Sequence, residues 1–339
     1  MHILRHVDRE FWLTVARQCD YATFFHTPLW QDIALGTFPA YRDATIGAVL
    51  DSGVRVVLPL LRVRRRGPLH ELWSSFELYY GGLIADGPYT SAEAQQIYRA
   101  ACGWQTFRLQ ITGNPLRSDS DVPVSYESQA DFTHMIALQP DFEQVFAHLP
   151  KDARSTYRNG LRKGVQVRRA TALADCHAYY DVYQDGLHRW RERGLKQIGA
   201  TYSLRQFELC YELSCQQPAL AQLWLAEVDG RIAAGNWVFY WNRHVGCWQG
   251  AAHSDLLSYR PFNVLEVEIA RDAVAHGYAY YDLGPSAGLE GLIAYKDSYN
   301  AKRHPFSRSI HTARGLTLLH QVRALLRSVR VIPGGTLNR

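Results

Sequence analysis

The chain has 339 residues and a mass of 38.7 kDa, which is enough for two domains with separate hydrophobic cores. Aromatic residues make up 12% and charged residues 20% of the sequence, a balance that excludes an intrinsically disordered chain. No stretch of 18 apolar residues occurs, and the amino terminus, MHILRHVDREFW, carries charges where a signal peptide needs an apolar segment. These features predict a cytoplasmic protein.

Six cysteines are present, and none forms a CxxC pair or has a histidine at the spacing of a zinc ligand. The thiols are therefore expected to be reduced and mostly buried. Neither a metal site nor a bound cofactor is predicted.

The first half of the chain contains a hairpin, a helix and a strand in that order. Residues 48–61, AVLDSGVRVVLPLL, read as two apolar strands around a turn that contains a glycine. A helix is expected at about 91–101, and an aromatic-rich strand, CGWQTFRLQI, follows at 102–111.

A strongly basic segment opens the second half at residues 151–169, KDARSTYRNGLRKGVQVRR. It holds seven positive residues and one acid, a net charge of +6, whereas the whole chain carries +5, so the remainder is at about −1. Arg154, Arg158 and Arg162 recur every four residues, which places them on one face of a helix. Together with Lys163 they are predicted to bind phosphates such as those of tRNA. A solvated helix face is the alternative.

The second half then repeats the pattern of the first. Residues 226–241, AEVDGRIAAGNWVFYW, form a hairpin with Asp229-Gly230 at its turn. A helix is expected to begin near Phe262, and HGYAYYDLGP at 276–285 is again a glycine followed by an aromatic strand. The equivalent glycines are 177 residues apart in the hairpins (230 − 53) and 174 apart before the strands (277 − 103). The matched spacing predicts a duplication.

A single lysine follows this strand and a glycine-rich turn, in YYDLGPSAGLEGLIAYKDSYNA at residues 280–301. Held on a constrained loop among aromatic rings that exclude water, Lys296 can stabilise the oxyanion of an acyl-transfer intermediate. The alternative is a surface lysine whose stem packs on Tyr295 and Tyr299.

Asp282, at the end of the same strand, is the second candidate for chemistry. Its carboxylate can accept the proton of an amine substrate or fix that amine. Alternatively it caps the loop through the backbone of Gly284 or Ser286. The residues themselves leave both roles open.

The end of the chain, GLTLLHQVRALLRSVR at about 315–330, combines arginines with an apolar stripe that includes Leu319 and Leu326. It is expected to be a helix that packs back on the first domain. Peripheral contact with a membrane surface is the alternative.

The duplicated unit, the basic helix and the YDLG strand that leads to an aromatic-lysine pair together resemble the Fem family, relatives of the GNAT acyltransferases. The resemblance begins at FFHTPLWQ (24–31), which looks like the family's opening Gln/His-x-x-x-Trp stretch, and ends with YKDSYNA at residue 301. It implies an α/β fold of two tandem GNAT-like domains with mixed central sheets flanked by helices. We place these domains at residues 1–140 and 141–313, with the helix at about 314–330 returning to the first.

The family resemblance implies aminoacyl transfer from an aminoacyl-tRNA to an amine, in many members on a peptidoglycan stem peptide. Lys296, after Tyr295, matches the lysine held near the transferred carbonyl, and Asp282 is the second catalytic candidate. The residues that the resemblance places at the substrate are Trp30, Tyr80, Tyr202, Gln206, Trp248, Tyr281, Ser286 and Tyr295.

The expected acceptor site departs from the family pattern. Members that use sugar-nucleotide precursors have a lysine two residues past the early tryptophan, where this chain has Asp32. They have an arginine and, four residues on, a tyrosine, where this chain has Tyr202 and Gln206, and Trp248 stands near a further tyrosine. A small amine or peptide is therefore expected as the acceptor, and not a UDP-linked muropeptide.

The expected donor follows from the absence of a glycine-rich pyrophosphate-binding motif in the sequence. CoA-dependent GNAT enzymes hold the pyrophosphate on backbone N–H groups of a glycine-rich loop at a helix start. Here the helix start has Tyr259, Arg260 and Pro261, and nothing resembles Q/R-x-x-G-x-G/A. Aminoacyl-tRNA is the predicted donor, with an acyl-CoA or acyl-carrier-protein donor as the alternative. The rival from another class is a non-catalytic module that binds RNA or a peptide; no DNA partner is expected.

Overall fold

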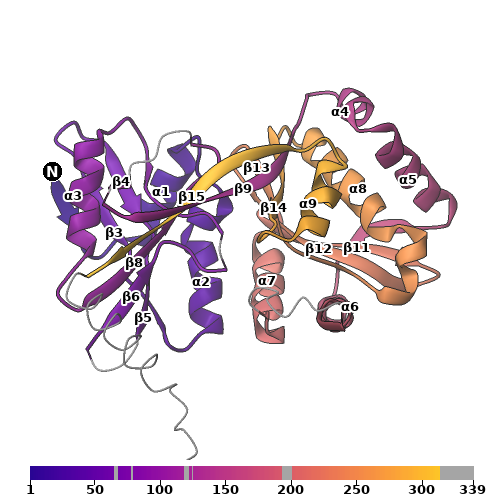
Figure 1. The fold of residues 1–339 in the computed structure, drawn as a ribbon, viewed down its shortest axis with the longest axis horizontal. Coiled ribbons are helices and arrows are strands. Elements are labelled where there is room, and N and C mark those ends of the chain that lie inside the picture. Colours follow the sequence, from indigo (N-terminus) through magenta and orange to yellow (C-terminus); the bar gives the residue numbers. More distant parts are fainter. Residues whose placement is uncertain (65–67, 78, 118–121, 124, 193–200, 314–339) are drawn as a thin grey trace, which may run out of the picture.

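The computed structural model describes residues 1–313 apart from 65–67, 78, 118–121, 124 and 193–200. Figure 1 shows two lobes side by side, joined by two long strands that run from one lobe into the other. The helix predicted at about 314–330 lies outside the described residues.

The first lobe is built from the amino-terminal elements. Its helices are α1 (Arg9–Gln18), α2 (Pro28–Thr37) and α3 (Ser91–Ala101), with a 3-10 turn at Phe24–His26. Its strands are β1 (His2–Leu4), β2 (Tyr41–Asp43), β3 (Ile46–Val49), β4 (Arg55–Leu58), β5 (Leu61–Arg64), β6 (His70–Trp73), β7 (Ile84–Ala85) and β8 (Thr106–Thr112).

The second lobe follows β9 (Glu127–Ala137), which crosses from the first. Its helices are α4 (Phe142–His148), α5 (Lys151–Arg162), α6 (Leu173–Glu192), α7 (Leu204–Gln216), α8 (Pro261–Ala275) and α9 (Glu290–Asp297), with a 3-10 turn at Ser254–Tyr259. Its strands are β10 (Gln166–Arg169), β11 (Ala221–Val228), β12 (Arg231–Trp241), β13 (His244–Ala252) and β14 (Tyr280–Pro285). The last strand, β15 (Lys302–Thr312), returns toward the first lobe.

One 11-stranded sheet passes through both lobes in the order β10-β11-β12-β13-β14-β9-β15-β8-β6-β5-β2. A second sheet, β1-β3-β4-β7, belongs to the first lobe alone. The end of β15 pairs with β8, Arg308 opposite Thr112, so a strand from the second half of the chain completes the first lobe. The domains predicted at 1–140 and 141–313 therefore share their central strands.

Both predicted hairpins are present. The turn between β11 and β12 has positive φ at Asp229 (50°) and at Gly230 (74°), which the tight type I′ turn requires and which Asp-Gly readily adopts. In the second lobe the hairpin is followed by a third antiparallel strand, β13, and then by α8. In the first lobe β5 and β6 come between the hairpin and its third antiparallel strand, β7, and α3 follows. The strand after each helix, β8 or β14, pairs in parallel with β6 or β13. The duplicated order of elements is therefore confirmed.

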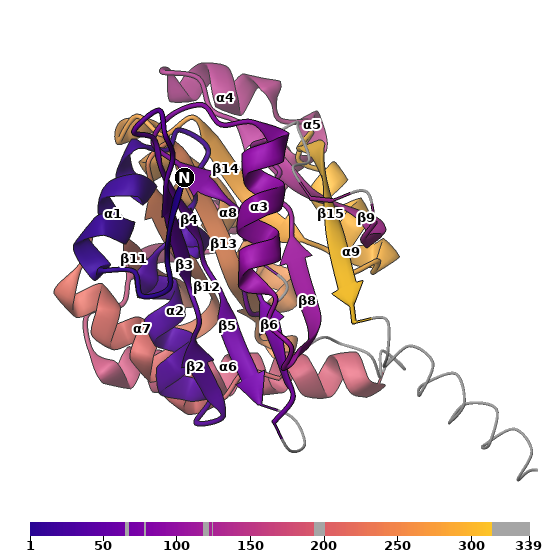
Figure 2. The same ribbon diagram turned by 90° about the vertical axis from the view of Figure 1, so that its left-hand side faces the viewer.

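Helices cover both faces of the second-lobe strands. α8 packs on one face through residues such as Val264 and Ile269. α6 and α7 pack on the other face, where Tyr179 and Phe207 share a core with Trp30 of the first lobe. α2 contacts α7 across the two lobes (Figure 1), and α3 covers strands of the first lobe (Figure 2). The second face is thus buried where the lobes meet.

Candidate active site

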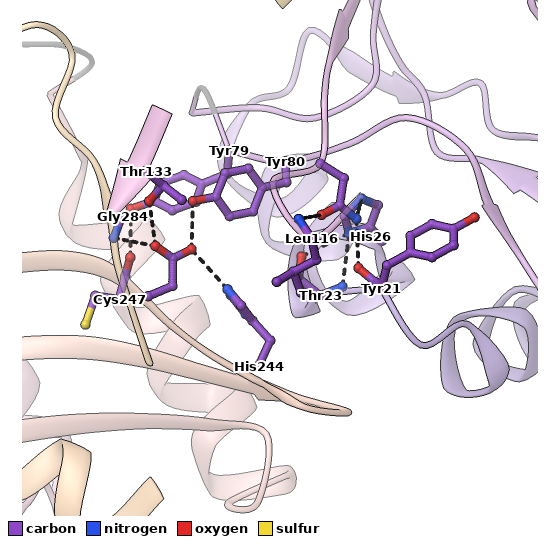
Figure 3. Close-up of polar contacts among 12 residues, drawn as sticks. Tyr21, Thr23, His26, Tyr79, Tyr80, Leu116, Thr133, His244, Cys247 and Gly284 are labelled. Atoms are coloured by element: carbon purple, nitrogen blue, oxygen red, sulfur yellow. Dashed lines mark hydrogen bonds and ion pairs between the residues drawn. The ribbon is translucent and has the colours of Figure 1, made fainter. Parts of the chain in front are cut away.

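Polar groups gather where two strands of the second lobe separate. β13 and β14 pair in parallel only over His244–Gly246, alongside Tyr280–Asp282. Just beyond, β13 has a bulge at Trp248, which is left out of the ladder with β12. Tyr79 of the first lobe fills the gap, because its Oη lies 2.9 Å from the carbonyl oxygen of Cys247 (Figure 3). The same Oη lies 2.6 Å from the carbonyl oxygen of Trp248.

Gly284 allows the backbone of β14 to approach Cys247 and Tyr79 closely. Its φ is 77°, and a β-carbon there would lie 3.2 Å from both the carbonyl oxygen of Cys247 and the Oη of Tyr79. Both the backbone conformation and the space therefore favour glycine over any other residue.

Lys296 lies in the last turn of α9, and its side chain reaches back to the end of β14. Its Nζ donates to the carbonyl oxygens of Gly284 (2.6 Å) and Pro285 (3.1 Å). The residue is 5% exposed, so the interpretation as a surface lysine is wrong. Burial lowers the pKa of Lys296 to about 8, although the nearby carboxylates of Asp282 and Glu266 favour the ammonium. An ammonium has three N–H donors, and the third has no hydrogen-bond partner among the described residues.

A buried carboxylate, Glu266 of α8, belongs to the surroundings of Lys296. It accepts a hydrogen bond from the Oη of Tyr281, and the Nδ2 of Asn236 lies 3.5 Å from its Oε1. Burial raises the pKa of Glu266 to about 7, against the effects of the Tyr281 hydrogen bond and the Lys296 charge. Cys247 donates from its Sγ to the Oη of Tyr281 at 3.2 Å, and burial raises the pKa of this thiol, which stays neutral.

The other predicted residues of this segment lie around the same lysine. The Oη atoms of Tyr295 and Tyr299 are 2.9 Å apart, and Asn263 donates to Tyr299 at 2.8 Å. Ser286 directly follows the proline whose carbonyl holds Lys296; it is buried, and its Oγ has no partner in the described part of the chain. Tyr281, Ser286 and Tyr295 are therefore close to Lys296, while their roles stay predictions.

Asp282 is completely buried and holds the two lobes together. Its Oδ2 accepts from the Oη of Tyr80 (2.7 Å) and the Nε2 of His244 (3.0 Å). Its Oδ1 accepts from the Oγ1 of Thr133 (2.5 Å) and the N–H of Gly284 (2.9 Å) (Figure 3). Burial by itself raises the pKa of Asp282, but these hydrogen bonds hold it below its usual value. With both oxygens occupied, the geometry favours the loop cap over the acceptor of a substrate proton.

Four further predicted residues meet where the lobes join. The ring centroids of Tyr202 and Trp248 are 4.9 Å apart, and those of Trp248 and Trp30 are 5.7 Å apart. Gln206, in the first turn of α7, has its Nε2 3.4 Å from the Oε1 of Glu77. Sequence analysis missed Glu77, because it stands in an irregular segment with no periodic pattern. Asp32, by contrast, faces Arg9 at 2.7 Å near the surface.

Other residues of the site were also missed. Tyr79, Thr133 and His244 act through contacts that join segments far apart in the chain, which no local pattern reveals. Glu266 had a usable signal, since it is an acid that stands between the apolar residues Leu265 and Val267 of α8.

The predicted basic helix is α5. Arg154, Arg158 and Arg162 lie on one side of it and line a shallow hollow together with Lys151, Ser155 and Leu161. The guanidinium of Arg158 also lies 5.3 Å from the ring centroid of Phe146. Within the described ranges no carboxylate forms an ion pair with these three arginines, so their charges are available to an anionic ligand. Lys163 differs, because its Nζ donates to the carbonyl oxygen of Ser258 at 2.7 Å.

The start of α8 is closed to a pyrophosphate. Its first residue, Pro261, has no N–H, and the N–H groups of Asn263 and Val264 both point to the carbonyl oxygen of Arg260 (3.1 and 3.3 Å). Gly160 of α5 packs against this turn so closely that a β-carbon there would lie 2.4 Å from Val264. This helix start therefore lacks the cluster of free N–H groups that binds phosphates in other proteins.

Comparison with known proteins identifies the fold. No curated protein sequence matches the chain. Residues 150–297 match the family model of the acetyltransferase (GNAT) domain. The structure is similar to that of FemX, with a TM-score of 0.67 and 13% identity over 91% of this chain and 97% of FemX. The chain has the Fem-like tandem GNAT fold.

Two further solved structures are similar to this Fem-like chain. One is the C-terminal domain of a putative lysylphosphatidylglycerol synthetase from Agrobacterium fabrum, with a TM-score of 0.57 and 12% identity over 97% of this chain and 98% of that one. The other is a tandem GNAT protein from the clavulanic acid biosynthesis pathway, with a TM-score of 0.52 and 12% identity over 92% and 98%.

These findings confirm the predicted fold class and the resemblance to the Fem-like GNAT proteins, and the GNAT-domain match over residues 150–297 supports the predicted acyltransferase activity. No described helix of the Fem-like chain combines the length and the apolar character that crossing a membrane requires. Within the same residues, no three His, Cys, Asp or Glu side chains are grouped as a metal site would need.

Proposed function

We propose that this protein transfers an aminoacyl group from aminoacyl-tRNA to an amine, with Lys296 as the electrostatic catalyst. The neutral amine nitrogen forms an amide bond with the acyl carbon and loses a proton, the ester bond to the tRNA ribose oxygen breaks, and that oxygen gains a proton and leaves as a hydroxyl. The proposal rests on one observation above all, the buried ammonium of Lys296 at the point where β13 and β14 separate.

Lys296 is suited to the negative charge that develops on the carbonyl oxygen in the tetrahedral intermediate. Two backbone carbonyls hold its Nζ in place, so little reorganisation is needed when the charge appears. Its third N–H is free to donate to the oxyanion. A pKa of about 8 keeps the group charged at neutral pH, and burial strengthens its electrostatic effect.

Asp282 acts in this proposal as a positioning residue. Its carboxylate accepts a hydrogen bond from the N–H of Gly284, and the carbonyl oxygen of the same glycine accepts one from the Nζ of Lys296. Its remaining hydrogen bonds come from Tyr80, Thr133 and His244, so the lobe interface determines where the end of β14 lies. The carboxylate thus acts through the backbone that it orients.

Two features favour aminoacyl-tRNA over CoA as the donor. The arginines of α5 form a basic face that has no ion pair with any described carboxylate, which fits a polyphosphate backbone. The start of α8, where a CoA pyrophosphate would need several free N–H groups, has Pro261 and two N–H groups already bonded to Arg260, and it is packed against Gly160. An acyl-CoA or acyl-carrier-protein donor is the alternative.

The acceptor in this proposal is a small amine or peptide. A UDP-linked muropeptide would need basic residues near the lobe junction to hold its phosphates, and Tyr202, Gln206 and Trp248 stand there instead. Asp32, near the early tryptophan, adds a negative charge that is already paired with Arg9.

A donor screen tests the proposal. Purified protein is incubated with charged tRNA carrying radiolabelled amino acids, or with labelled CoA thioesters, and with a set of amines; amide formation is measured. We expect label transfer from charged tRNA, loss of that transfer in Lys296→Met, and none from CoA thioesters. The matched control is Lys302→Met, an exposed lysine on β15. Transfer from CoA thioesters but not from charged tRNA would show that the donor is an acyl-CoA. Transfer that persists in Lys296→Met would show that Lys296 is not the catalyst.

A further inference from the structure

Glu77 is a partly buried carboxylate that has no cationic partner among the described residues. It lies in the first lobe with φ of 59°, a conformation that side-chain-bearing residues seldom adopt. Its Oε1 accepts from Gln206 at 3.4 Å, while its Oε2 is buried and has no hydrogen-bond partner among the described residues. Neither Lys, Arg nor His forms an ion pair with it within those residues. Burial raises the pKa of Glu77 to about 7, against the hydrogen bond from Gln206.

The groups around Glu77 are also left with unused polar atoms. Gln206 is 1% exposed, yet its Oε1 has no partner in the described chain. The indole N–H groups of Trp30 and Trp248 likewise lack partners there, although both tryptophans are buried. Buried polar atoms are normally paired, so four such atoms in one neighbourhood need an explanation.

This cluster connects directly to the proposed site of transfer. Trp248, whose ring lies 4.9 Å from that of Tyr202, is the bulged residue of β13. Its carbonyl accepts from Tyr79, whose Oη lies 3.2 Å from the position of a β-carbon on Gly284. Glu77 and Tyr202 are only partly buried, whereas the four unpaired atoms themselves are buried, so a ligand would have to reach them past the exposed parts of these two residues.

We propose that Glu77 and Gln206 form the acceptor subsite and bind an alkylammonium group of a cationic acceptor, distinct from the neutral amine that forms the amide bond. The free Oε2 of Glu77 and the free Oε1 of Gln206 accept N–H groups of the ammonium, and the aromatic rings around them exclude water. The indole N–H groups of Trp30 and Trp248 donate to a carbonyl or hydroxyl oxygen of the same molecule. The inference rests on the proposed function, because it names the class of acceptor for that reaction.

Calorimetric titration without any donor tests the subsite. The probes are n-pentylamine and 1-pentanol, which have the same chain and differ in the charged head group. We expect the protein to bind the amine at least about tenfold more tightly than the alcohol, as a charge-assisted hydrogen bond would provide. Glu77→Gln should abolish the preference, and Gln206→Leu should reduce it.

The matched control is Glu208→Gln on the same helix as Gln206. Glu208 is partly buried and paired with His177 at 3.0 Å, away from the cluster, so this variant should keep the full preference. Equal binding of amine and alcohol by the unaltered protein overturns the inference, as does a preference that persists in folded Glu77→Gln.

Binding and transfer measurements together show whether the acceptor subsite or the proposed reaction is wrong. Lys296→Met should bind the amine normally while failing to transfer. If the amine preference is found but no charged tRNA supports transfer, the proposed reaction fails and the subsite stands. If transfer occurs with no amine preference, or is unaffected in Glu77→Gln, the subsite fails and the reaction stands.

Discussion

Replacing Lys296 by methionine removes the ammonium and keeps most of the apolar stem. The variant loses hydrogen bonds to the carbonyls of Gly284 and Pro285, each worth roughly 0.5–1.5 kcal/mol. It also loses a buried charge, which by itself is favourable. The lowering of the pKa of Lys296 from 10.5 to about 8 means that the folded state disfavours the charged form by roughly 3 kcal/mol. The two effects oppose each other, so we expect the free energy of unfolding to change by only about 1–2 kcal/mol.

The kinetic effect should be much larger than this. If the ammonium stabilises the oxyanion, its loss should lower kcat by about two to three orders of magnitude, which corresponds to roughly 2.7–4 kcal/mol, and leave KM for charged tRNA little changed. If Lys296 instead grips the donor equally in ground and transition states, KM should rise and kcat should be spared. The assay is transfer from radiolabelled charged tRNA, with circular dichroism and thermal unfolding as controls for the fold.

The pH dependence gives a second measure of the same group. Because the pKa of Lys296 is lower in the folded protein than in the unfolded chain, the unfolded chain binds more protons between about pH 8 and 10.5. Stability should therefore rise with pH through this window by the contribution of Lys296, and that contribution should be absent in Lys296→Met. The rate should fall above about pH 8 as the ammonium is lost, whereas Lys296→Arg keeps its charge and should show partial activity without this fall. Near wild-type kcat/KM in a folded Lys296→Met would falsify the assignment.

Reversing Arg154, Arg158 and Arg162 to Glu should weaken the binding of charged tRNA and flatten its salt dependence by about one unit per lost phosphate contact, as measured by filter binding; unchanged binding would rule out α5 as the contact. A UDP-linked muropeptide should be a poor acceptor, and transfer to it as fast as to a simple amine in the radiolabel assay would contradict this. Glu77→Gln should stabilise the protein above pH 7 by roughly 1–3 kcal/mol in urea unfolding, with the gain vanishing below pH 4.5, because the raised pKa of Glu77 makes its ionisation unfavourable in the folded state. Asp282→Asn should destabilise the protein by roughly 1–3 kcal/mol at neutral pH, and the difference should shrink as pH falls below about 4, since the lowered pKa of Asp282 stabilises the fold only while it is ionised; an equally stable variant would show that the four hydrogen bonds contribute little.

Local patterns were sufficient for some elements of the fold. The turn at Asp229-Gly230 needs two positive φ angles, which few dipeptides other than Asp-Gly supply at low cost, so the hairpin could be predicted from residues alone. The four-residue spacing of Arg154 and Arg158 likewise determines that they share a helix face, wherever that helix packs. The duplicated order could be read because each half repeats the same signals at nearly the same distance.

Local patterns were not sufficient for the roles of the charged residues. From sequence, Lys296 could equally have been a surface lysine; its burial depends on how α9 folds back on β14, which places two carbonyls at its Nζ. Asp282 had two open interpretations, because its partners Tyr80 and Thr133 come from segments that only the lobe interface brings to it.

By itself the sequence determined the hairpins, the basic helix, the duplication and the charge distribution of this protein, because these depend on backbone preferences and on residue spacing. It placed Lys296 on a loop, whereas the structure has this lysine in α9. Only the tertiary structure decided which charges are buried and which remain unpaired. Glu77 shows why: its solvation depends on Gln206 of α7, more than a hundred residues away, and on the packing of one lobe against the other. The pKa of a buried carboxylate depends on the groups that pack around it. These groups come from distant parts of the chain, so no short stretch of sequence reveals them.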